Sequence, residues 1–263
     1  MKAIILSAGR GSRLFPLTVD TPKCLVPVQG DHPILGVQLQ ALAECGIDEA
    51  VIVVGFGAEY VEKYLLDNPV PGIRVRTVFN PFYDCSDNLM SCWVVRAEMD
   101  GDFLLMNGDT MWEPAVLETL LASPPAPVTV TINEKDEYDD DDMKVSLQAD
   151  GRLEAVSKGL DGVIDGEAIG LIAFRGEGPK IFVDTLERTA RDPGALTDYY
   201  LRIIESLARF VTIRTASITG LWWGEVDDHA DLDEVRAVLN PVTRPLAAIV
   251  NGPLQRAPLR LAR

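Results

Sequence analysis

The chain has 263 residues, a mass of 28.7 kDa and a formal net charge of −16, with 24 Lys and Arg against 40 Asp and Glu. This length and an apolar share of 47% predict one globular domain with a sizeable core. The acidic balance argues against a nucleic-acid binder and against a protein that sits on anionic membranes, because both need a basic face.

The first half of the chain alternates strands with helices. Short apolar or β-branched runs predict buried strands, and apolar residues at helical spacing predict helices. The alternating order predicts an α/β fold, with a mostly parallel twisted sheet and helices on both faces. Beginning with a strand, we expect these elements at Lys2–Leu6, Pro33–Cys45, Ala50–Val54, Tyr60–Leu66, Val75–Phe79, Asp87–Glu98, Asp102–Met106 and Glu113–Ala122.

The second half is richer in strands, and the pair Asp150-Gly151 is a strong hairpin signal. We expect Leu221–Val226 to return to the main sheet beside the strand that ends at Met106. The whole is interpreted as one domain over residues 1–240, with a small β-rich insertion at about 133–220 and a Pro- and Arg-containing tail at 241–263. Strands are predicted at Val128–Ile132, Lys144–Leu147, Leu153–Ser157, Ala168–Phe174 and Val211–Ala216, and helices at Lys180–Arg191, Asp198–Ala208 and Ala230–Leu239.

Targeting and redox signals favour a cytoplasmic protein. The first apolar run is too short for a signal peptide, and no run reaches membrane length. The four cysteines form no C-x-x-C pair, so we expect free thiols and no zinc site. The chain has only two histidines, which argues against imidazole-based catalysis and against a His-rich metal site.

The first predicted strand runs into a glycine-rich loop, Ala8-Gly9-Arg10-Gly11-Ser12-Arg13. Two glycines let backbone N–H groups approach a phosphate chain closely, and Arg13 and Lys23 supply positive charge. The third glycine of a dinucleotide fingerprint is replaced by Leu14, which excludes a Rossmann dehydrogenase, and no Gly-Lys-Ser/Thr closes a P-loop. Taken alone, the two glycines also fit an ordinary strand-to-loop turn.

The longer pattern resembles the sugar-phosphate nucleotidyltransferase superfamily. Several later segments resemble its LicC-like cytidylyltransferase branch, which includes phosphocholine and phosphonate cytidylyltransferases. The superfamily pattern is Ala8-Gly9-x-Gly11-x-Arg13-Leu14 with Pro16-Leu17-Thr18 and Thr21-Pro22-Lys23-x-Leu25-x-Pro27-Val28. The branch segments are Asn80-Pro81-Phe82-Tyr83, Asp87-Asn88-Leu89-Met90-Ser91, Asp140–Val145, Gly166–Gly170 and Trp223-Gly224-Glu225-Val226-Asp227.

This resemblance implies a GT-A/Rossmann-like fold and nucleotidyl transfer, in which an acceptor oxygen attacks the α-phosphorus of a nucleoside triphosphate and pyrophosphate leaves. Such chemistry needs positioning and charge neutralisation rather than a covalent nucleophile. By the family's pattern, Arg13 would hold the β- and γ-phosphates and Lys23 the α-phosphate, as the catalytic residues. The implied nucleotide-binding residues are Leu6, Ala8, Gly9, Gly11, Ser12, Arg13, Lys23, Asn88 and Gly108.

The resemblance also implies a Mg²⁺ cofactor. Asp109 follows a predicted strand, at the carboxyl edge where open α/β sheets bind ligands, and carboxylate oxygens suit Mg²⁺. Asp227 is the expected second ligand, with Glu225 two residues earlier on the same strand face. The alternative for Asp109 is a plain turn aspartate after Gly108.

The acceptor end leaves more alternatives open. The stretch Glu134–Asp142 holds seven acids and one Lys, and is either a solvated loop or a lid that attracts a cationic acceptor. The tryptophans are either core residues or an aromatic surface for a quaternary ammonium group, and Asp87 is either a helix cap or an acceptor ligand. The expected substrate-binding residues are Tyr83, Asp87, Trp112, Asp142, Lys144, Glu167 and Trp223.

The leading hypothesis is a Mg²⁺-dependent cytidylyltransferase that joins CTP to phosphocholine, 2-aminoethylphosphonate or 2-hydroxyethylphosphonate. A sugar- or inositol-phosphate nucleotidyltransferase and a catalytically silent nucleotide-binding regulator are the alternatives. No nucleic-acid or membrane partner is expected. The charge is divided unevenly: residues 1–30 are +3 and the tail is +4, so residues 1–240 together are −20. The phosphate loop is therefore locally basic inside an acidic protein.

Overall fold

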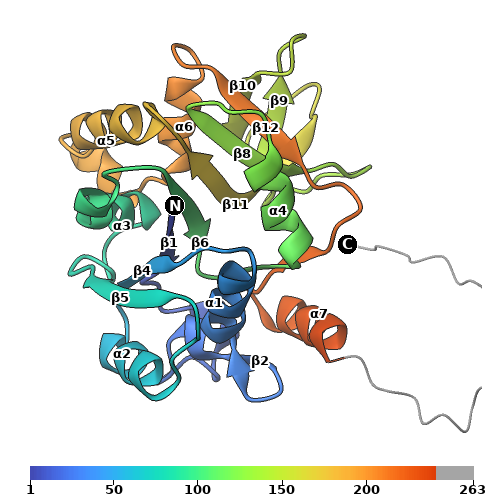
Figure 1. Cartoon of the computed structure of the whole chain (residues 1–263). Helices are drawn as coiled ribbons and strands as arrows, with labels where there is room; N and C mark the ends of the chain where they lie inside the picture. Colours follow the sequence, from blue (N-terminus) through green and yellow to red (C-terminus); the bar gives the residue numbers. More distant parts are fainter. Residues whose placement is uncertain (241–263) are drawn as a thin grey trace, which may run out of the picture.

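The computed structural model describes residues 1–240, so the prediction for the tail at 241–263 lies outside the described residues. A nine-stranded mixed sheet forms the centre of the molecule, with helices on both faces (Figure 1). Its strands are β1 (Lys2–Ser7), β4 (Glu49–Val54), β5 (Arg74–Phe79), β6 (Phe103–Asn107), β8 (Val128–Asn133), β9 (Lys144–Leu147), β10 (Leu153–Ser157), β11 (Gly166–Phe174) and β12 (Ile213–Ser217).

Two small sheets pair β2 (Pro27–Gln29) with β3 (His32–Pro33) and β7 (Thr110–Trp112) with β13 (Trp223–Glu225). Short 3₁₀ turns lie at Ser12–Leu14, Lys23–Leu25, Arg96–Glu98 and Pro193–Thr197. The α-helices within the described residues are α1 (Ile34–Glu44), α2 (Ala58–Asp67), α3 (Asn88–Val95), α4 (Pro114–Ala122), α5 (Gly178–Thr189), α6 (Leu201–Leu207) and α7 (His229–Leu239).

Strands β5, β4, β1 and β6 form the parallel half of the sheet, as predicted. Ile5 lies between Ile52 of β4 and Met106 of β6 and packs on the face covered by α1, α2 and α4. Its neighbour Ile4 points to the other face, against α3, α5 and α6. Figure 1 shows α3, α5 and α6 above the sheet and α1 and α2 below it. Because both faces are covered, these strands are continuous apolar runs.

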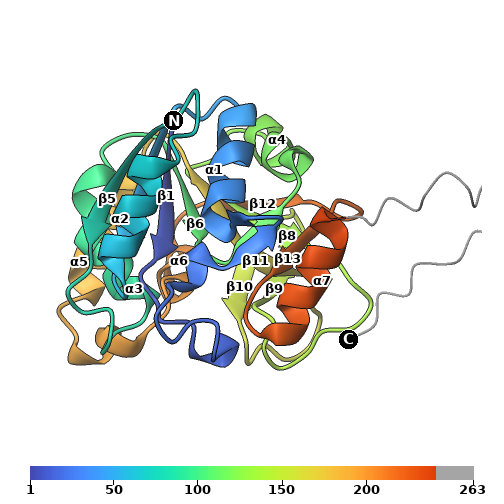
Figure 2. The ribbon, with the colours of Figure 1, turned by 90° about the horizontal axis from the view of Figure 1, so that it is seen from below.

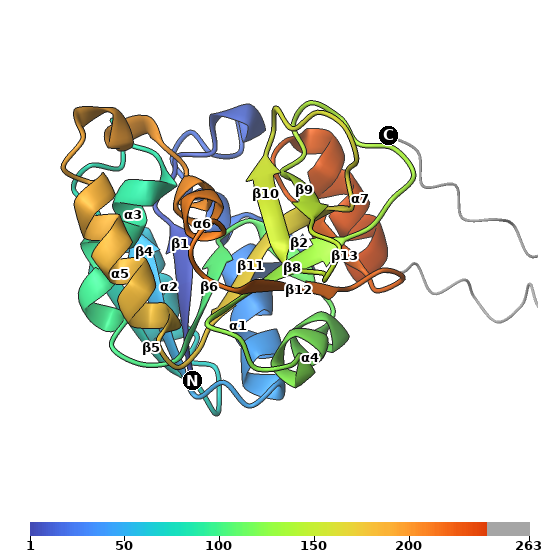
Figure 3. The same cartoon turned by 90° about the horizontal axis from the view of Figure 1, so that it is seen from above.

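Strand β11 organises the antiparallel half, because it pairs with β6, β8 and β9. It bends at Gly170, whose φ of +71° is in the left-handed region. A Cβ there would lie 2.3 Å from Nδ2 of Asn107, so glycine is required for this approach. Figure 3 shows β8, β9, β10 and β12 gathered on one side, with α6 beside β10.

The prediction that Leu221–Val226 joins the main sheet beside β6 is wrong. The two edges of β6 are already occupied by β1 and β11. The chain instead turns after β6 at Gly108, and β13 pairs antiparallel with β7 in a separate ribbon. Figure 2 shows α7 packed beside this ribbon.

Other boundaries differ by a few residues. The helix expected from Asp198 to Ala208 is the shorter α6, which begins at Leu201, and the 3₁₀ turn Pro193–Thr197 precedes it. The predicted helix from Asp87 to Glu98 is α3, which Asp87 caps, followed by a 3₁₀ turn. All four cysteines are free thiols. No helix among the described residues is long and apolar enough to cross a membrane.

Candidate active site

The glycine-rich loop leaves β1 and turns back toward Lys23. Gly11 has a φ of +69°, and its carbonyl accepts a hydrogen bond from Oγ1 of Thr18 at 2.6 Å. A Cβ on Gly11 would lie 2.8 Å from Cβ of Lys23. Glycine at this position therefore lets the Lys23 side chain pass close to the loop, while Gly9 faces open space.

The Lys23 ammonium lies between two carboxylates. Its Nζ is 2.7 Å from Oδ2 of Asp109 and 2.7 Å from Oδ1 of Asp227. Arg13 reaches the other oxygen of Asp227 at 3.3 Å. Burial alone would lower the pKa of Lys23, but the two carboxylates outweigh burial and raise it. Burial likewise would raise the pKa of Asp227, and Lys23 and Arg13 outweigh it, so that pKa is lowered.

The ribbon of β7 and β13 brings a third carboxylate to the same place. Glu225 is the register partner of Thr110, whose Oγ1 donates to Oε1 of Glu225 at 3.3 Å. The backbone N–H of Val226 donates to the carbonyl of Asp109 at 3.1 Å. Burial, with the nearby charges of Asp109 and Asp227, raises the pKa of Glu225 to about 8. The three acids that the sequence suggested as metal ligands are thus brought together, by a route other than the predicted one.

The donor set at this position suits a hard divalent cation. Asp109 and Asp227 both direct a carboxylate oxygen at the Lys23 ammonium. Besides burial, the negative charges of Asp109 and Asp227 raise the pKa of Glu225, and a bound cation would offset these charges. Among residues 1–240, no three His, Cys, Asp or Glu side chains converge closely enough to hold a metal alone. Two carboxylates completed by phosphate oxygens of a bound nucleotide are the usual arrangement for Mg²⁺.

Several predicted nucleotide residues fix the backbone around the loop. The N–H of Gly108 donates to the carbonyl of Leu6 at 3.0 Å, and a Cβ on Gly108 would lie 2.3 Å from Oγ of Ser7. The Ala8 carbonyl accepts from the N–H of Phe56 at 3.0 Å. Ser12 is exposed at the start of its 3₁₀ turn. These contacts hold the ends of β1 and β6 side by side, next to the glycine-rich loop.

Asn88 and Asp87 hold neighbouring segments of the chain. Oδ1 of Asn88 accepts a hydrogen bond from the backbone N–H of Tyr200 at 2.9 Å, which ties α3 to the start of α6. The Asp87 side chain caps α3, and burial raises its pKa. Tyr83 is half-buried, with its ring edge toward Phe79.

The tryptophans are placed in or beside the core. Trp112 is 4% exposed and packs in the cluster around α1 and α4, and its Nε1 has no partner among the described residues. Trp223 is its register partner and is half-buried against the same cluster. Of the two alternatives for Trp112, the structure therefore favours the core residue.

The acceptor-side acids form an ion cluster of one buried and one partly buried carboxylate, which includes an exposed lysine missed by the sequence analysis. Nζ of Lys135 lies 2.8 Å from Oδ2 of Asp142 and 2.7 Å from Oε2 of Glu167. Asn133 donates to the other oxygen of Glu167 at 3.1 Å. Glu167 is only 4% exposed, and burial raises its pKa. Asp142 and Glu167 therefore form a pair of carboxylates that holds one ammonium group, that of Lys135.

Lys158 is a second residue that the sequence analysis missed, and it lies between the acceptor-side residues Asp141 and Lys144 and the carboxylate of Asp227. Its Nζ is 3.2 Å from Oδ1 of Asp141, and its carbonyl accepts from Nζ of Lys144 at 3.1 Å. Its positive charge also contributes to lowering the pKa of Asp227. One weak signal for this residue is present in the sequence, since a basic residue directly follows the predicted strand Leu153–Ser157.

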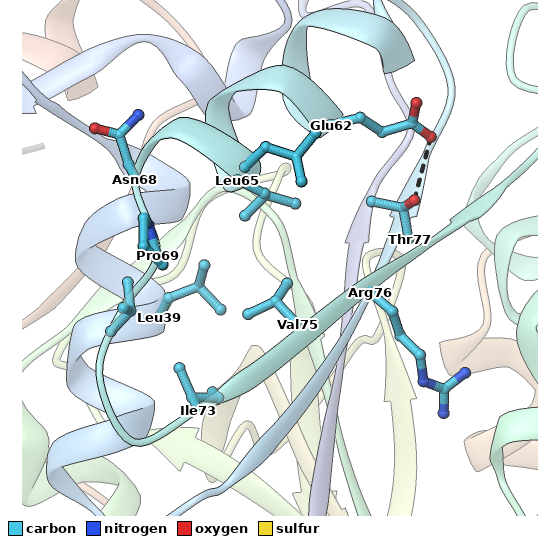
Figure 4. Close-up of a pocket in the computed structure, with 11 residues that line it drawn as sticks. Leu39, Glu62, Leu65, Asn68, Pro69, Ile73, Val75, Arg76 and Thr77 are labelled. Atoms are coloured by element: carbon cyan, nitrogen blue, oxygen red, sulfur yellow. Dashed lines mark hydrogen bonds between the residues drawn. The ribbon is translucent and has the colours of Figure 1, made fainter.

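Two cavities lie elsewhere on the parallel half. One of about 330 Å³ lies next to the loop and is lined by Gly55, Phe56 and Tyr83, among others. The larger, of about 420 Å³, lies between α2 and the edge strand β5 (Figure 4). Its lining reaches from Leu39 to Thr77, toward the amino end of β5, whereas the carboxylates lie past the carboxyl end of β6. The larger cavity is therefore separate from the site formed by Lys23, Asp109 and Asp227, which we call the charged site.

Several known proteins are similar to this chain in sequence or in fold. The nucleotidyl transferase family model matches residues 2–139. The CMP-5'-(3-aminopropyl)phosphonate synthase of Streptomyces rubellomurinus is 33% identical over 244 residues, which are 88% of this chain and 37% of that protein. The choline-phosphate cytidylyltransferase of Streptococcus pneumoniae is 39% identical over 105 residues, 40% of this chain and 43% of that protein. The matches thus span less than half of these two relatives.

A solved structure, the CTP:phosphocholine cytidylyltransferase of Streptococcus pneumoniae, has the same fold. Its TM-score is 0.70 at 22% identity, and the match covers 90% of this chain and 98% of that one. The family model covers more than half of the chain and contains the glycine-rich loop, Lys23 and Asp109. The chain therefore belongs to the nucleotidyl transferase family.

Proposed function

We propose that the protein is a Mg²⁺-dependent cytidylyltransferase that couples CTP to a small phosphate or phosphonate with a cationic head group, releasing pyrophosphate. The observation that carries this proposal is the convergence of Asp109 and Asp227 on Lys23, beside a glycine-rich loop at the carboxyl ends of β1 and β6. The choice of CTP is supported by the two cytidylyltransferase relatives.

The reaction needs in-line attack of an acceptor oxygen on the α-phosphorus, with the oxygen–phosphorus bond to pyrophosphate breaking on the opposite side. Lys23 would turn from the carboxylates to the α-phosphate and stabilise the charge that builds there. Arg13, whose side chain is 62% exposed, would exchange its contact with Asp227 for a forked contact with the terminal phosphates. Asp109 and Asp227 would hold Mg²⁺, which when bound neutralises phosphate charge.

The acceptor would bind between the charged site and β9–β11. Lys158 and Lys144 are the positive groups on that side and are suited to the acceptor's phosphate or phosphonate. The Asp142 and Glu167 carboxylates already hold one ammonium group, that of Lys135, and are suited to a second cationic head group. The aminopropylphosphonate and phosphocholine in the relatives' names are acceptors of this kind.

Pyrophosphate release with each of four nucleoside triphosphates, crossed with phosphocholine, 2-aminoethylphosphonate, 2-hydroxyethylphosphonate, inositol 1-phosphate and glucose 1-phosphate, tests the proposal. We expect release with CTP and an amino or quaternary-ammonium acceptor, and its loss when EDTA removes divalent ions. Release only with a sugar or inositol phosphate would contradict the acceptor assignment. No release under any pairing would favour a silent nucleotide-binding regulator.

A further inference from the structure

The turn Asn107–Thr110, which presents Asp109, is held by a buried side chain with no part in the proposed reaction. Nε2 of Gln38, on α1, donates to the carbonyl of Asn107 at 3.0 Å and to the carbonyl of Thr110 at 2.9 Å. These two carbonyls flank Gly108 and Asp109 in the chain. One side-chain amide therefore bridges both ends of the turn.

This amide does more for local geometry than for stability. Gln38 is 2% exposed, and its Oε1 has no hydrogen-bond partner among the described residues. A buried acceptor without a partner costs free energy, which offsets part of what the two hydrogen bonds contribute. Only the NH₂ end of the amide can meet two carbonyl oxygens, so both of its protons are used on this one turn.

A second contact holds the same turn from the other face of the sheet. Oη of Tyr200, the residue before α6, donates to Oδ1 of Asn107 at 3.3 Å and is buried in the cluster around α3, α5 and α6. The Asn107 amide fits there because Gly170 has no Cβ. Gln38 lies on the side of α1, and Tyr200 on the side of α6.

We propose that Gln38 is a positioning residue for Asp109, assisted by Tyr200 through Asn107. Together they fix the turn so that the Asp109 carboxylate faces Asp227 and Lys23. The inference rests on the proposed function, in which Asp109 binds a divalent ion. A displacement of about 1 Å at such a group lowers turnover strongly, so a buried amide on α1 would control a carboxylate that it does not touch.

The test uses the full chain with Gln38→Met, which keeps the length of the side chain and removes both donors. Tyr200→Phe removes only one hydroxyl and is the milder second variant. Thr131→Val is the matched control, because the Thr131 hydroxyl is buried in β8 and has no hydrogen-bond partner within residues 1–240. Mn²⁺ binding is followed by the electron paramagnetic resonance signal of the free ion, and pyrophosphate release gives kcat and KM.

We expect Gln38→Met to weaken Mn²⁺ binding and to lower kcat, each roughly tenfold, with KM for the acceptor unchanged. Tyr200→Phe should also weaken Mn²⁺ binding and lower kcat, by less than Gln38→Met does. Thr131→Val should change neither Mn²⁺ binding nor kcat. Wild-type Mn²⁺ affinity and kcat in a folded Gln38→Met, or in Tyr200→Phe if Gln38→Met does not fold, would overturn the inference. A wild-type protein that neither binds Mn²⁺ nor releases pyrophosphate would overturn the proposed function, and the inference with it.

Discussion

The two halves of the sheet position charged groups in different ways. In the parallel half, β5-β4-β1-β6, the side chains around Asp109 follow strand ends and meet at one edge. In the antiparallel half, Lys135 and Asp142 of the loop between β8 and β9 meet Glu167 of β11, so this cluster is assembled where neighbouring strands come together. The side chains of Asp109 and Asp227 are 27% and 42% exposed, whereas those of Asp142 and Glu167 are 12% and 6% exposed.

This difference indicates where substitutions can change the choice of acceptor without abolishing the reaction. The edge of a parallel sheet collects side chains from the carboxyl ends of the strands, whatever the rest of the fold does. The antiparallel half adds strands on which single side chains can vary. We therefore expect substitutions at the charged site to abolish turnover, and substitutions at the ion cluster to change the choice of acceptor.

The largest effect is expected from Lys23→Ala and Asp109→Ala. Each removes charge from the position of the α-phosphate and the divalent ion, so kcat for pyrophosphate release should fall by about 10²–10³. Circular dichroism should show an intact fold, because both side chains lie at the edge of the sheet. Turnover near that of the wild type would show that the assigned role is wrong.

The next effect concerns stability in the absence of a metal ion. The pKa of Glu225 is raised from 4.5 to about 8, so the folded state keeps a proton that the unfolded state has lost. The contribution of Glu225 to stability should therefore be largest below about pH 4.5 and should fall on the order of a few kcal/mol as the pH rises toward 8. Denaturant titration of Glu225→Gln across this range should give a flatter profile.

Glu118→Gln, at an exposed position on α4, is the control for this titration and should keep the wild-type slope. Added Mg²⁺ should restore wild-type stability at pH 8, because it neutralises the crowded carboxylates. An identical pH profile in the wild type and Glu225→Gln would contradict the raised pKa.

A smaller effect is expected at the ion cluster. Glu167→Gln keeps the size of the side chain and removes one of the two carboxylates that hold an ammonium group. We expect KM for 2-aminoethylphosphonate to rise roughly tenfold, as for loss of a charged hydrogen bond, and KM for 2-hydroxyethylphosphonate to stay unchanged. Equal increases for both acceptors would place the head group elsewhere.

The smallest effect is expected from Gly11→Ala in the loop. The φ of +69° costs about 1 kcal/mol for a residue with a Cβ, and the new methyl group meets the side chain of Lys23. KM for CTP should rise roughly fivefold. Gly30→Ala, with a φ of +56° and open space around it, is the matched control and should leave KM for CTP unchanged.

Much of the parallel half could be predicted because its signals are local. A buried parallel strand is a continuous apolar run, and the loop that follows carries its glycines and charges within a few residues. For this reason strands β1, β4, β5 and β6, the glycine-rich loop and the position of Asp109 after β6 agree with the sequence analysis, whereas the short pair β2 and β3 was not predicted. The roles assigned to Arg13 and Lys23 in catalysis remain predictions.

Long-range pairing decided the remainder. Glu225 meets Asp109 because β13 pairs with β7, and the edges of β6 were already filled, which no local pattern reveals. The contacts of Lys135 and Lys158 likewise depend on which strands become neighbours in the antiparallel half. The sequence by itself determined the fold class and the place of the glycine-rich loop after β1, because those signals repeat along one segment. Only the tertiary structure decided how the acids are paired, because charges distant in sequence interact only once the strands are in register.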